Sequence, residues 1–140
     1  RKVLKDKFLK FEGFEDQEQI TNDIDSEFMV RASALIEQNI GNSEFTIDDF
    51  SSAMMVSRSL LYRKIKALTD LSPIEYITYS RLRFAMKMLN SCQYSVKEVA
   101  YKSGFSDPRY FSTIFKKHFQ QTPTECMKKD KEGLIQDTNQ

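Results

Sequence analysis

The sequence has few residues that interrupt regular secondary structure, with only four glycines and three prolines among its 140 residues. This scarcity of turn residues argues against many short strands and favours helices. Every apolar run is far shorter than the ~20 residues that cross a bilayer, so we expect no membrane contact from this chain. The hydrophobic content of 40% is nevertheless ample for a packed core.

Clusters of residues that could carry chemistry are also scarce. The two cysteines, Cys92 and Cys126, form no CxxC motif and have no histidine nearby, so we expect no metal site and no cofactor. They are interpreted as small apolar residues in a reducing compartment. The sequence shows no glycine-rich phosphate loop, no nucleophile–base pair and no convincing carboxylate pair, so we do not expect this chain to be an enzyme.

What the chain does contain is an internal repeat. The segment 46–50 (TIDDF) matches 95–99 (SVKEV) at an offset of 49 residues, and 72–73 (SP) matches 122–123 (TP) at an offset of 50. One residue is therefore inserted between the two matches in the second copy, and we expect it in a turn. A repeat of this length indicates one supersecondary unit that is used twice.

Each copy predicts a short helix, a turn and a second helix. The first helices begin with capping boxes, in which two residues satisfy each other's backbone N–H groups: Thr46 with Asp49, and Ser95 with Glu98. Gly104 lies where the second copy must turn. Ser57 and Asp107, the latter followed by Pro108, are the expected caps of the second helices. This is the helix-turn-helix plan, whose second helix enters the major groove of DNA.

The periodicity extends this plan to the whole chain. It predicts an all-α fold of two helix-turn-helix subdomains joined by a long linker helix, with about seven helices. The first expected helix buries Phe28, Ala32, Leu35, Ile36 and Ile40 on one face. The expected helices are 26–40, 47–53, 58–68, 73–90, 96–102, 108–118 and 123–129.

The charges are unevenly distributed along the chain. Residues 54–120 contain 12 Lys or Arg against 4 Asp or Glu, whereas residues 1–53 contain 6 against 12. A basic segment that carries both second helices is typical of a protein that binds phosphates.

The second helices leave polar side chains on the face opposite their apolar stripes. On the first, Arg63 can form a bidentate bond to guanine and Tyr62 can contact a thymine methyl group. Lys66, a turn further on, is better placed for a phosphate. The outward positions are Ser59, Tyr62, Arg63 and Lys66 on the first, and Arg109, Ser112, Thr113 and Lys116 on the second.

These residues resemble the DNA-binding module of the AraC/XylS family of bacterial transcription regulators. The likeness is densest over residues 96–123, VKEVAYKSGFSDPRYFSTIFKKHFQQTP. Residues 57–77, SRSLLYRKIKALTDLSPIEYI, are more particularly similar to the C-terminal output modules of hybrid two-component regulators. In such proteins the sensor, kinase, receiver and output module share one polypeptide. A sequence that begins with Arg1 fits a piece of a longer chain of this kind.

The resemblance implies a domain organisation and a set of partners. Residues 1–25 are expected to connect to an upstream receiver-like domain, 26–130 to form the DNA-binding domain, and 131–140 to form a flexible tail. Within the domain we expect helix-turn-helix one at 46–69, the linker helix at 72–90 and helix-turn-helix two at 95–119. The implied partners are double-stranded promoter or operator DNA, RNA polymerase, and receiver and kinase domains of the same chain. The fragment is expected in the cytoplasm, and its parent could be membrane-embedded with a histidine kinase.

The resemblance also assigns roles to individual residues. Its base-reading positions fall on Ser59, Tyr62, Arg63, Arg109, Ser112 and Thr113. We expect phosphate contacts from Ser57, Arg58, Lys66, Lys116 and Lys117. The family commonly has glycine where Asp70 and Gln120 stand, which questions the backbone at the ends of both second helices, because other residues pay a cost in left-handed geometry. It also commonly has Tyr-Arg where this chain has Cys126 and Met127.

Two other functions are alternatives to sequence-specific DNA binding. The main alternative is a helical protein-interaction adaptor whose basic face meets an acidic partner, which would need no repeated reading helix. An RNA binder is less favoured, because the sequence lacks the aromatic stacking platform that single strands use.

Overall fold

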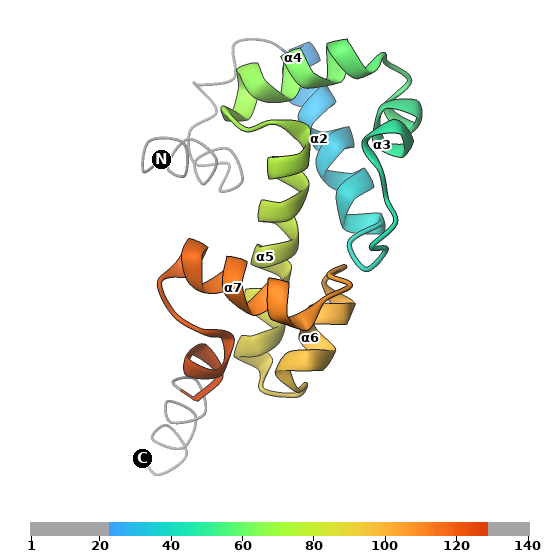
Figure 1. Cartoon of the computed structure of the whole chain (residues 1–140). Coiled ribbons are helices and arrows are strands. Elements are labelled where there is room, and N and C mark those ends of the chain that lie inside the picture. The colour runs from blue at the N-terminus through green and yellow to red at the C-terminus, as the bar shows by residue number, and fades with distance from the viewer. Residues whose placement is uncertain (1–22, 129–140) are drawn as a thin grey trace. The chain divides into compact units, whose positions relative to one another are not determined.

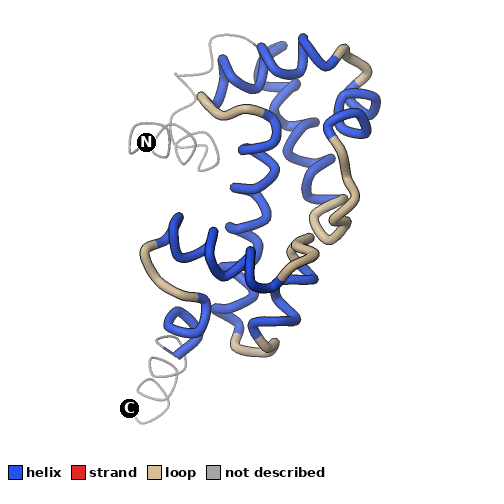
Figure 2. Tube along the Cα trace, in the orientation of Figure 1, coloured by secondary structure: helices blue, strands red, loops and turns tan. Residues whose placement is uncertain are grey.

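The computed structural model describes residues 23–128, and within that range all regular structure is helical (Figure 2). The predicted all-α class is confirmed, and the described residues contain seven helical segments. These are α2 (Asp23–Gln38), α3 (Ile47–Met54), α4 (Arg58–Thr69), α5 (Pro73–Ser91), α6 (Val96–Lys102), α7 (Pro108–Phe119) and a short helical segment at 123–128 (Figure 1). The expected tail at 131–140, and the expected connector up to residue 22, lie outside the described residues.

The first helix differs most from its prediction. We expected it at 26–40, preceded by a linker, but α2 spans Asp23–Gln38. The two acidic residues in its first turn, Asp23 and Asp25, favour the helix because carboxylates stabilise the positive N-terminal end of its dipole. Asp25 also forms a 3.2 Å ion pair between its Oδ1 and the Nζ of Lys64 on α4, a tertiary contact that the sequence pattern did not reveal. We expected residues 1–25 to form a connector, but residues 23–25 belong to α2.

The described residues form two compact units. Unit 1 consists of residues 23–39 and 44–79, and unit 2 of residues 40–43 and 80–128. Unit 1 holds α2, α3, α4 and the start of α5, whereas unit 2 holds the rest of α5, α6 and α7. The long helix α5 thus contributes residues to both units.

The core of unit 1 is built where α2 packs on α3 and α3 packs on α4. Phe28, Ala32 and Ile36 are buried as expected, but Leu35 and Ile40 are only half-buried. Met29, which was not predicted, is fully buried. A partly buried polar pair lies at this core, with the hydroxyls of the half-buried Ser33 and the buried Tyr76 2.8 Å apart. The other buried apolar residues here are Phe50, Met54, Leu61, Ile65, Ile77 and Tyr79.

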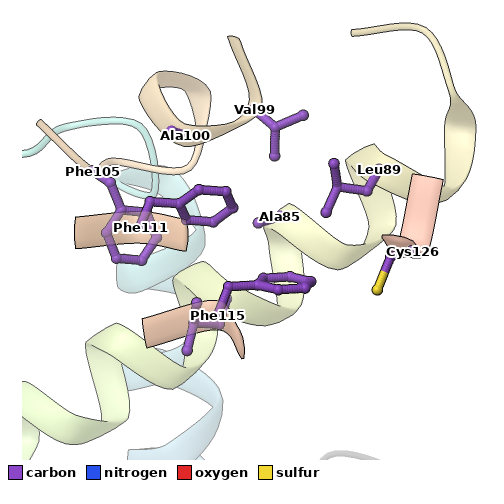
Figure 3. Close-up of a cluster of buried hydrophobic side chains, with 9 residues drawn as sticks. Ala85, Leu89, Val99, Ala100, Phe105, Phe111, Phe115 and Cys126 are labelled. Atoms are coloured by element: carbon purple, nitrogen blue, oxygen red, sulfur yellow. The ribbon is translucent and has the colours of Figure 1, made fainter. Parts of the chain in front are cut away.

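The core of unit 2 is an aromatic stack against α5 (Figure 3). The ring centroids of Phe105 and Phe111 are 5.1 Å apart, and those of Phe111 and Phe115 are 5.6 Å apart, within the range of favourable aromatic pairs. The side chains that α5 and α6 contribute include Leu82, Ala85, Leu89, Val99 and Ala100. Cys126 joins this cluster as a buried thiol, as expected for a small apolar residue, and its Sγ donates to Gln121 Oε1 at 3.2 Å.

Candidate nucleic-acid interface

The turns of the two helix pairs have the same backbone geometry. In unit 1, Met55 has a left-handed φ of 60° and the N–H of Val56 donates to the carbonyl of Ser51 at 3.1 Å. In unit 2, Gly104 has a φ of 90° and the N–H of Phe105 donates to the carbonyl of Ala100 at 3.0 Å. The left-handed residue, the donor and the acceptor of one turn are each 49 positions from their counterparts in the other turn. This is the same offset that relates segments 46–50 and 95–99. Both units therefore turn by the same helix-ending motif.

The inserted residue of the second copy lies in this turn, as predicted. The left-handed residues correspond at an offset of 49, whereas the helix caps Ser57 and Asp107 correspond at 50. The Oγ of Ser57 accepts from the N–H of Leu60 at 3.1 Å, and Asp107 Oδ1 accepts from the N–H of Arg109 at 2.9 Å. Both predicted caps are confirmed, as are the capping boxes of Thr46 and Ser95.

The ends of α4 and α7 also match. Asp70 and Gln120, where glycine was expected, both have a left-handed φ of 64°. Their N–H groups donate to the carbonyls of Lys66 at 2.9 Å and Lys116 at 2.8 Å. Side chains reinforce both ends, because Lys66 Nζ donates to the Asp70 carbonyl at 2.9 Å and Gln120 Nε2 donates to the Lys117 carbonyl at 3.1 Å. Both helices therefore end in the left-handed geometry that glycine favours, although neither residue is glycine.

The outward face of α4 carries the residues that the sequence placed there. Leu61 and Ile65 are buried, while Ser59, Arg63 and Lys66 are exposed. Tyr62 retains half of its accessible surface. Arg63 makes no hydrogen bond or ion pair with other described residues, so its five donors can meet a ligand.

The outward face of α7 differs in one respect from the prediction. Arg109 and Thr113 are exposed, but Ser112 is half-buried. The Thr113 hydroxyl donates to the Arg109 carbonyl at 3.0 Å, so its methyl group and remaining lone pairs are what it can offer to a base. Lys116 and Lys117 are both exposed in the last turn.

Two features near these faces were not predicted. Arg58, an expected phosphate ligand, forms an exposed ion pair in which its Nε lies 3.3 Å from Asp48 Oδ1 at the start of α3. Such surface pairs contribute only about 0–1 kcal/mol, so Arg58 can still reach a phosphate, but the phosphate must compete with Asp48 for it. On α7, Tyr110 is 56% exposed beside Arg109 and is a further candidate for a backbone contact. Its position in the first turn of α7, three residues after the cap Asp107, is the feature of the sequence that could have indicated it.

Between residues 23 and 128 no group of three His, Cys, Asp or Glu side chains could hold a metal ion. The same stretch has no helix with the length and apolar character needed to cross a membrane.

The fold and this site define a class of protein. Two helix-turn-helix units in one chain, each with a basic, exposed second helix, are a DNA-binding domain of a transcription regulator. Residues 50–129 match the helix-turn-helix domain family, and the chain belongs to the AraC-type branch of that family.

Known proteins of related sequence and structure agree with this membership. A transcriptional regulator from Chromobacterium violaceum, described as an AraC-type DNA-binding domain-containing protein, superposes with a TM-score of 0.71 at 28% identity, over 78% of this chain and 96% of that one. The C-terminal domain of AraT, a response regulator from Geobacillus stearothermophilus, superposes with a TM-score of 0.67 at 28% identity, over 73% and 84% of the two chains. The Histidine kinase P4 of Formosa agariphila is 34% identical over 89% of this chain, which spans only 9% of that kinase.

Proposed function

We propose that this domain reads a specific double-stranded DNA site by inserting α4 and α7 into the major groove. The observation that carries the proposal is the repeated geometry. Two turns of the same hydrogen-bonding pattern each lead into a capped helix whose exposed face bears Arg63 or Arg109. Arginine is the side chain best suited to bidentate bonding with the O6 and N7 atoms of guanine.

Within this proposal the exposed residues divide into base readers and phosphate ligands. Ser59, Tyr62 and Arg63 on α4 face the base edges, together with Arg109, Ser112 and Thr113 on α7. Because Ser112 is half-buried, we assign it the smallest share of the contact. Phosphate contacts come from helix starts and ends, where N–H groups and lysines lie: Ser57, Arg58, Lys66, Lys116 and Lys117.

We infer further that the domain is the output end of a longer regulator of the hybrid two-component type. The similarity to Histidine kinase P4 over most of this chain, and to the output domain of the response regulator AraT, supports that placement. In such a parent, receiver and kinase domains of the same polypeptide would control DNA binding, and RNA polymerase would be the partner at the promoter. The domain would then act in the cytoplasm, with a membrane-embedded parent as one arrangement.

The proposal is tested first by fluorescence anisotropy with a randomised duplex at several salt concentrations and with single-stranded RNA as competitor. We expect a binding constant whose logarithm falls linearly with the logarithm of the salt concentration, and we expect RNA to displace the duplex only weakly. Failure to bind any duplex at low salt would contradict the proposal and favour a protein-interaction adaptor.

Site selection and substitution then test the assigned residues. Arg63→Ala and Arg109→Ala should each weaken the selected site by about 1–3 kcal/mol and relax the preference at one base pair. Lys87→Ala is the charge-matched control, since Lys87 is exposed on α5, outside both second helices, and should leave the base preference unchanged. If both arginine variants keep the affinity and preference of the parent, α4 and α7 are not the reading helices.

A further inference from the structure

The two units, although built on the same plan, carry opposite charge. Among the described residues, unit 1 has 5 Lys or Arg against 9 Asp or Glu, whereas unit 2 has 9 against 3. The formal charges are therefore −4 and +6. Salt screens charges over ~10 Å at 0.1 M, so the charges nearest to a reading helix act on it most strongly.

The cations of unit 1 are nearly all engaged within the unit. Arg58 pairs with Asp48, and Lys64 pairs with Asp25 while lying 5.6 Å from the centre of the Phe28 ring. Of the remaining cations, Lys66 donates to the carbonyl of Asp70 and Arg31 donates to the carbonyl of Met54 at 3.0 Å. Arg63 is the one basic side chain of unit 1 without such a partner among the described residues.

The lysines and the arginine of α7, unlike most of the cations in unit 1, have no ion-pair or side-chain hydrogen-bond partner among the described residues. Arg109, Lys116 and Lys117 are exposed, and none of the three forms an ion pair or a side-chain hydrogen bond with a described residue. The contrast extends to the first helices of the two pairs. At the offset of 49 residues, Asp48 of unit 1 corresponds to Lys97 of unit 2, which is exposed. Where unit 1 has a carboxylate that holds Arg58, unit 2 has another cation.

We propose that the two units divide DNA binding unequally: unit 2 supplies most of the sequence-independent phosphate binding, and unit 1 docks mainly through base contacts at a specific site. This inference rests on the proposed function. Sequence-independent affinity comes from released counterions, and only cations that reach phosphates release them. Unit 1 carries net negative charge, so on a random duplex it gains little from docking. At its specific site Arg63 and Tyr62 add the base contacts that make docking favourable.

The division predicts which lysines and arginines set the salt dependence. Lys116→Ala/Lys117→Ala in unit 2 and Arg58→Ala/Lys66→Ala in unit 1 each remove two expected phosphate ligands from the whole 140-residue chain. On a random duplex, log affinity falls as log salt rises, with a slope of about −0.9 per phosphate contact. The unit 2 variant should make this slope less steep by about 1.8. The unit 1 variant should change that slope by less than about half as much. Circular dichroism of both variants checks that the helices are retained.

A second pair of variants tests the restraint on Arg58 in the opposite direction. Asp48→Asn should release Arg58, tighten binding to the random duplex and steepen its salt slope. Asp49→Asn is the matched control, because it removes the same charge one residue along and can still accept the 3.0 Å hydrogen bond from the N–H of Thr46. The control should change the slope less than Asp48→Asn does.

The outcomes separate this inference from the function on which it rests. An unsubstituted chain that fails to bind duplex DNA at low salt overturns both. Duplex binding in which the unit 1 double variant flattens the slope as much as the unit 2 double variant overturns the inference alone. Equal effects of Asp48→Asn and Asp49→Asn likewise overturn it, because Arg58 would then not be held back by its carboxylate partner.

Discussion

Replacing Gly104 by alanine should destabilise unit 2 strongly, for reasons that the structure makes explicit. A Cβ atom on this residue would lie 2.2 Å from the carbonyl oxygen of Ile40 and 2.7 Å from Nε of Arg81. The first of these contacts is with backbone, which cannot rotate away as a side chain can. The φ of 90° is also unfavourable for any residue with a side chain.

The magnitude follows from adding the separate costs. A left-handed backbone costs an L-residue roughly 1–2 kcal/mol. Movement of the Ile40 carbonyl would disturb the bond of 2.8 Å in which Arg81 donates to the Asn42 carbonyl. The Nε of Arg81 is already buried without a hydrogen-bond partner among the described residues, so this guanidinium has no alternative bond at hand. Losing this exposed hydrogen bond costs a further ~0.5–1.5 kcal/mol, which brings the expected loss to about 2–3 kcal/mol.

Urea denaturation followed by far-ultraviolet circular dichroism measures this loss, and the repeat supplies a matched control. Met55 occupies the corresponding position of unit 1 with a left-handed φ of 60°, and its side chain is 86% exposed. Met55→Ala should therefore change the free energy of unfolding by no more than about 0.5 kcal/mol. A loss below about 1 kcal/mol for Gly104→Ala, or equal losses at the two positions, would refute the reasoning.

Two further predictions concern a partly buried hydroxyl pair and the capping boxes. Tyr76→Phe keeps the buried ring but removes the hydroxyl that lies 2.8 Å from that of Ser33, and should cost about 1 kcal/mol. In a double-mutant cycle with Ser33→Ala the two losses should not add, whereas additive losses would show that the hydroxyls do not interact. Hydrogen bonds from Ser95 hold the pKa of Glu98 below its ordinary 4.5. The stability that the folded chain gains from bonds to the ionised carboxylate is therefore present above pH ~4.5, and it is lost as pH falls through the lowered pKa. Titration of Glu98 by NMR should show a midpoint below 4.5 that rises in Ser95→Ala; an unchanged midpoint would contradict the capping-box account.

Much of the fold could be predicted because local signals and periodicity agreed. Capping residues fixed the starts of α3, α4, α6 and α7 to the residue, since each satisfies orphan N–H groups that only a helix start leaves free. Helix α2 was misplaced because its start depends on tertiary contacts. Asp25 pairs with Lys64, which is 39 positions away, and no local pattern encodes that pair. The burial of Met29 in place of Leu35 likewise depends on how α2 is rotated against α3.

The outward faces of α4 and α7 could be predicted as sets of positions, because an apolar stripe defines its opposite face. What the sequence did not reveal is which basic side chains are paired with a carboxylate. Arg58 and Lys116 look alike as candidates for phosphate contact, yet one is paired with Asp48 and the other has no carboxylate within ion-pair distance among the described residues. The basic count over residues 54–120 combined both units and so concealed that unit 1 is acidic. Pairing across helices decides this, and it appears only once the chain is folded.

The left-handed residues show why glycine is a useful signal but not a necessary one. Four non-glycine residues have positive φ in the described chain, and Met55, Asp70 and Gln120 among them end helices α3, α4 and α7. Asp70 and Gln120 offset part of the cost with bonds from Lys66 and to Lys117, and Met55 projects into solvent, where a side chain meets no obstacle. Gly104 differs because the carbonyl of Ile40 occupies the space that a side chain would need. A left-handed turn thus tolerates many residues where it faces solvent, and requires glycine where another segment packs against it.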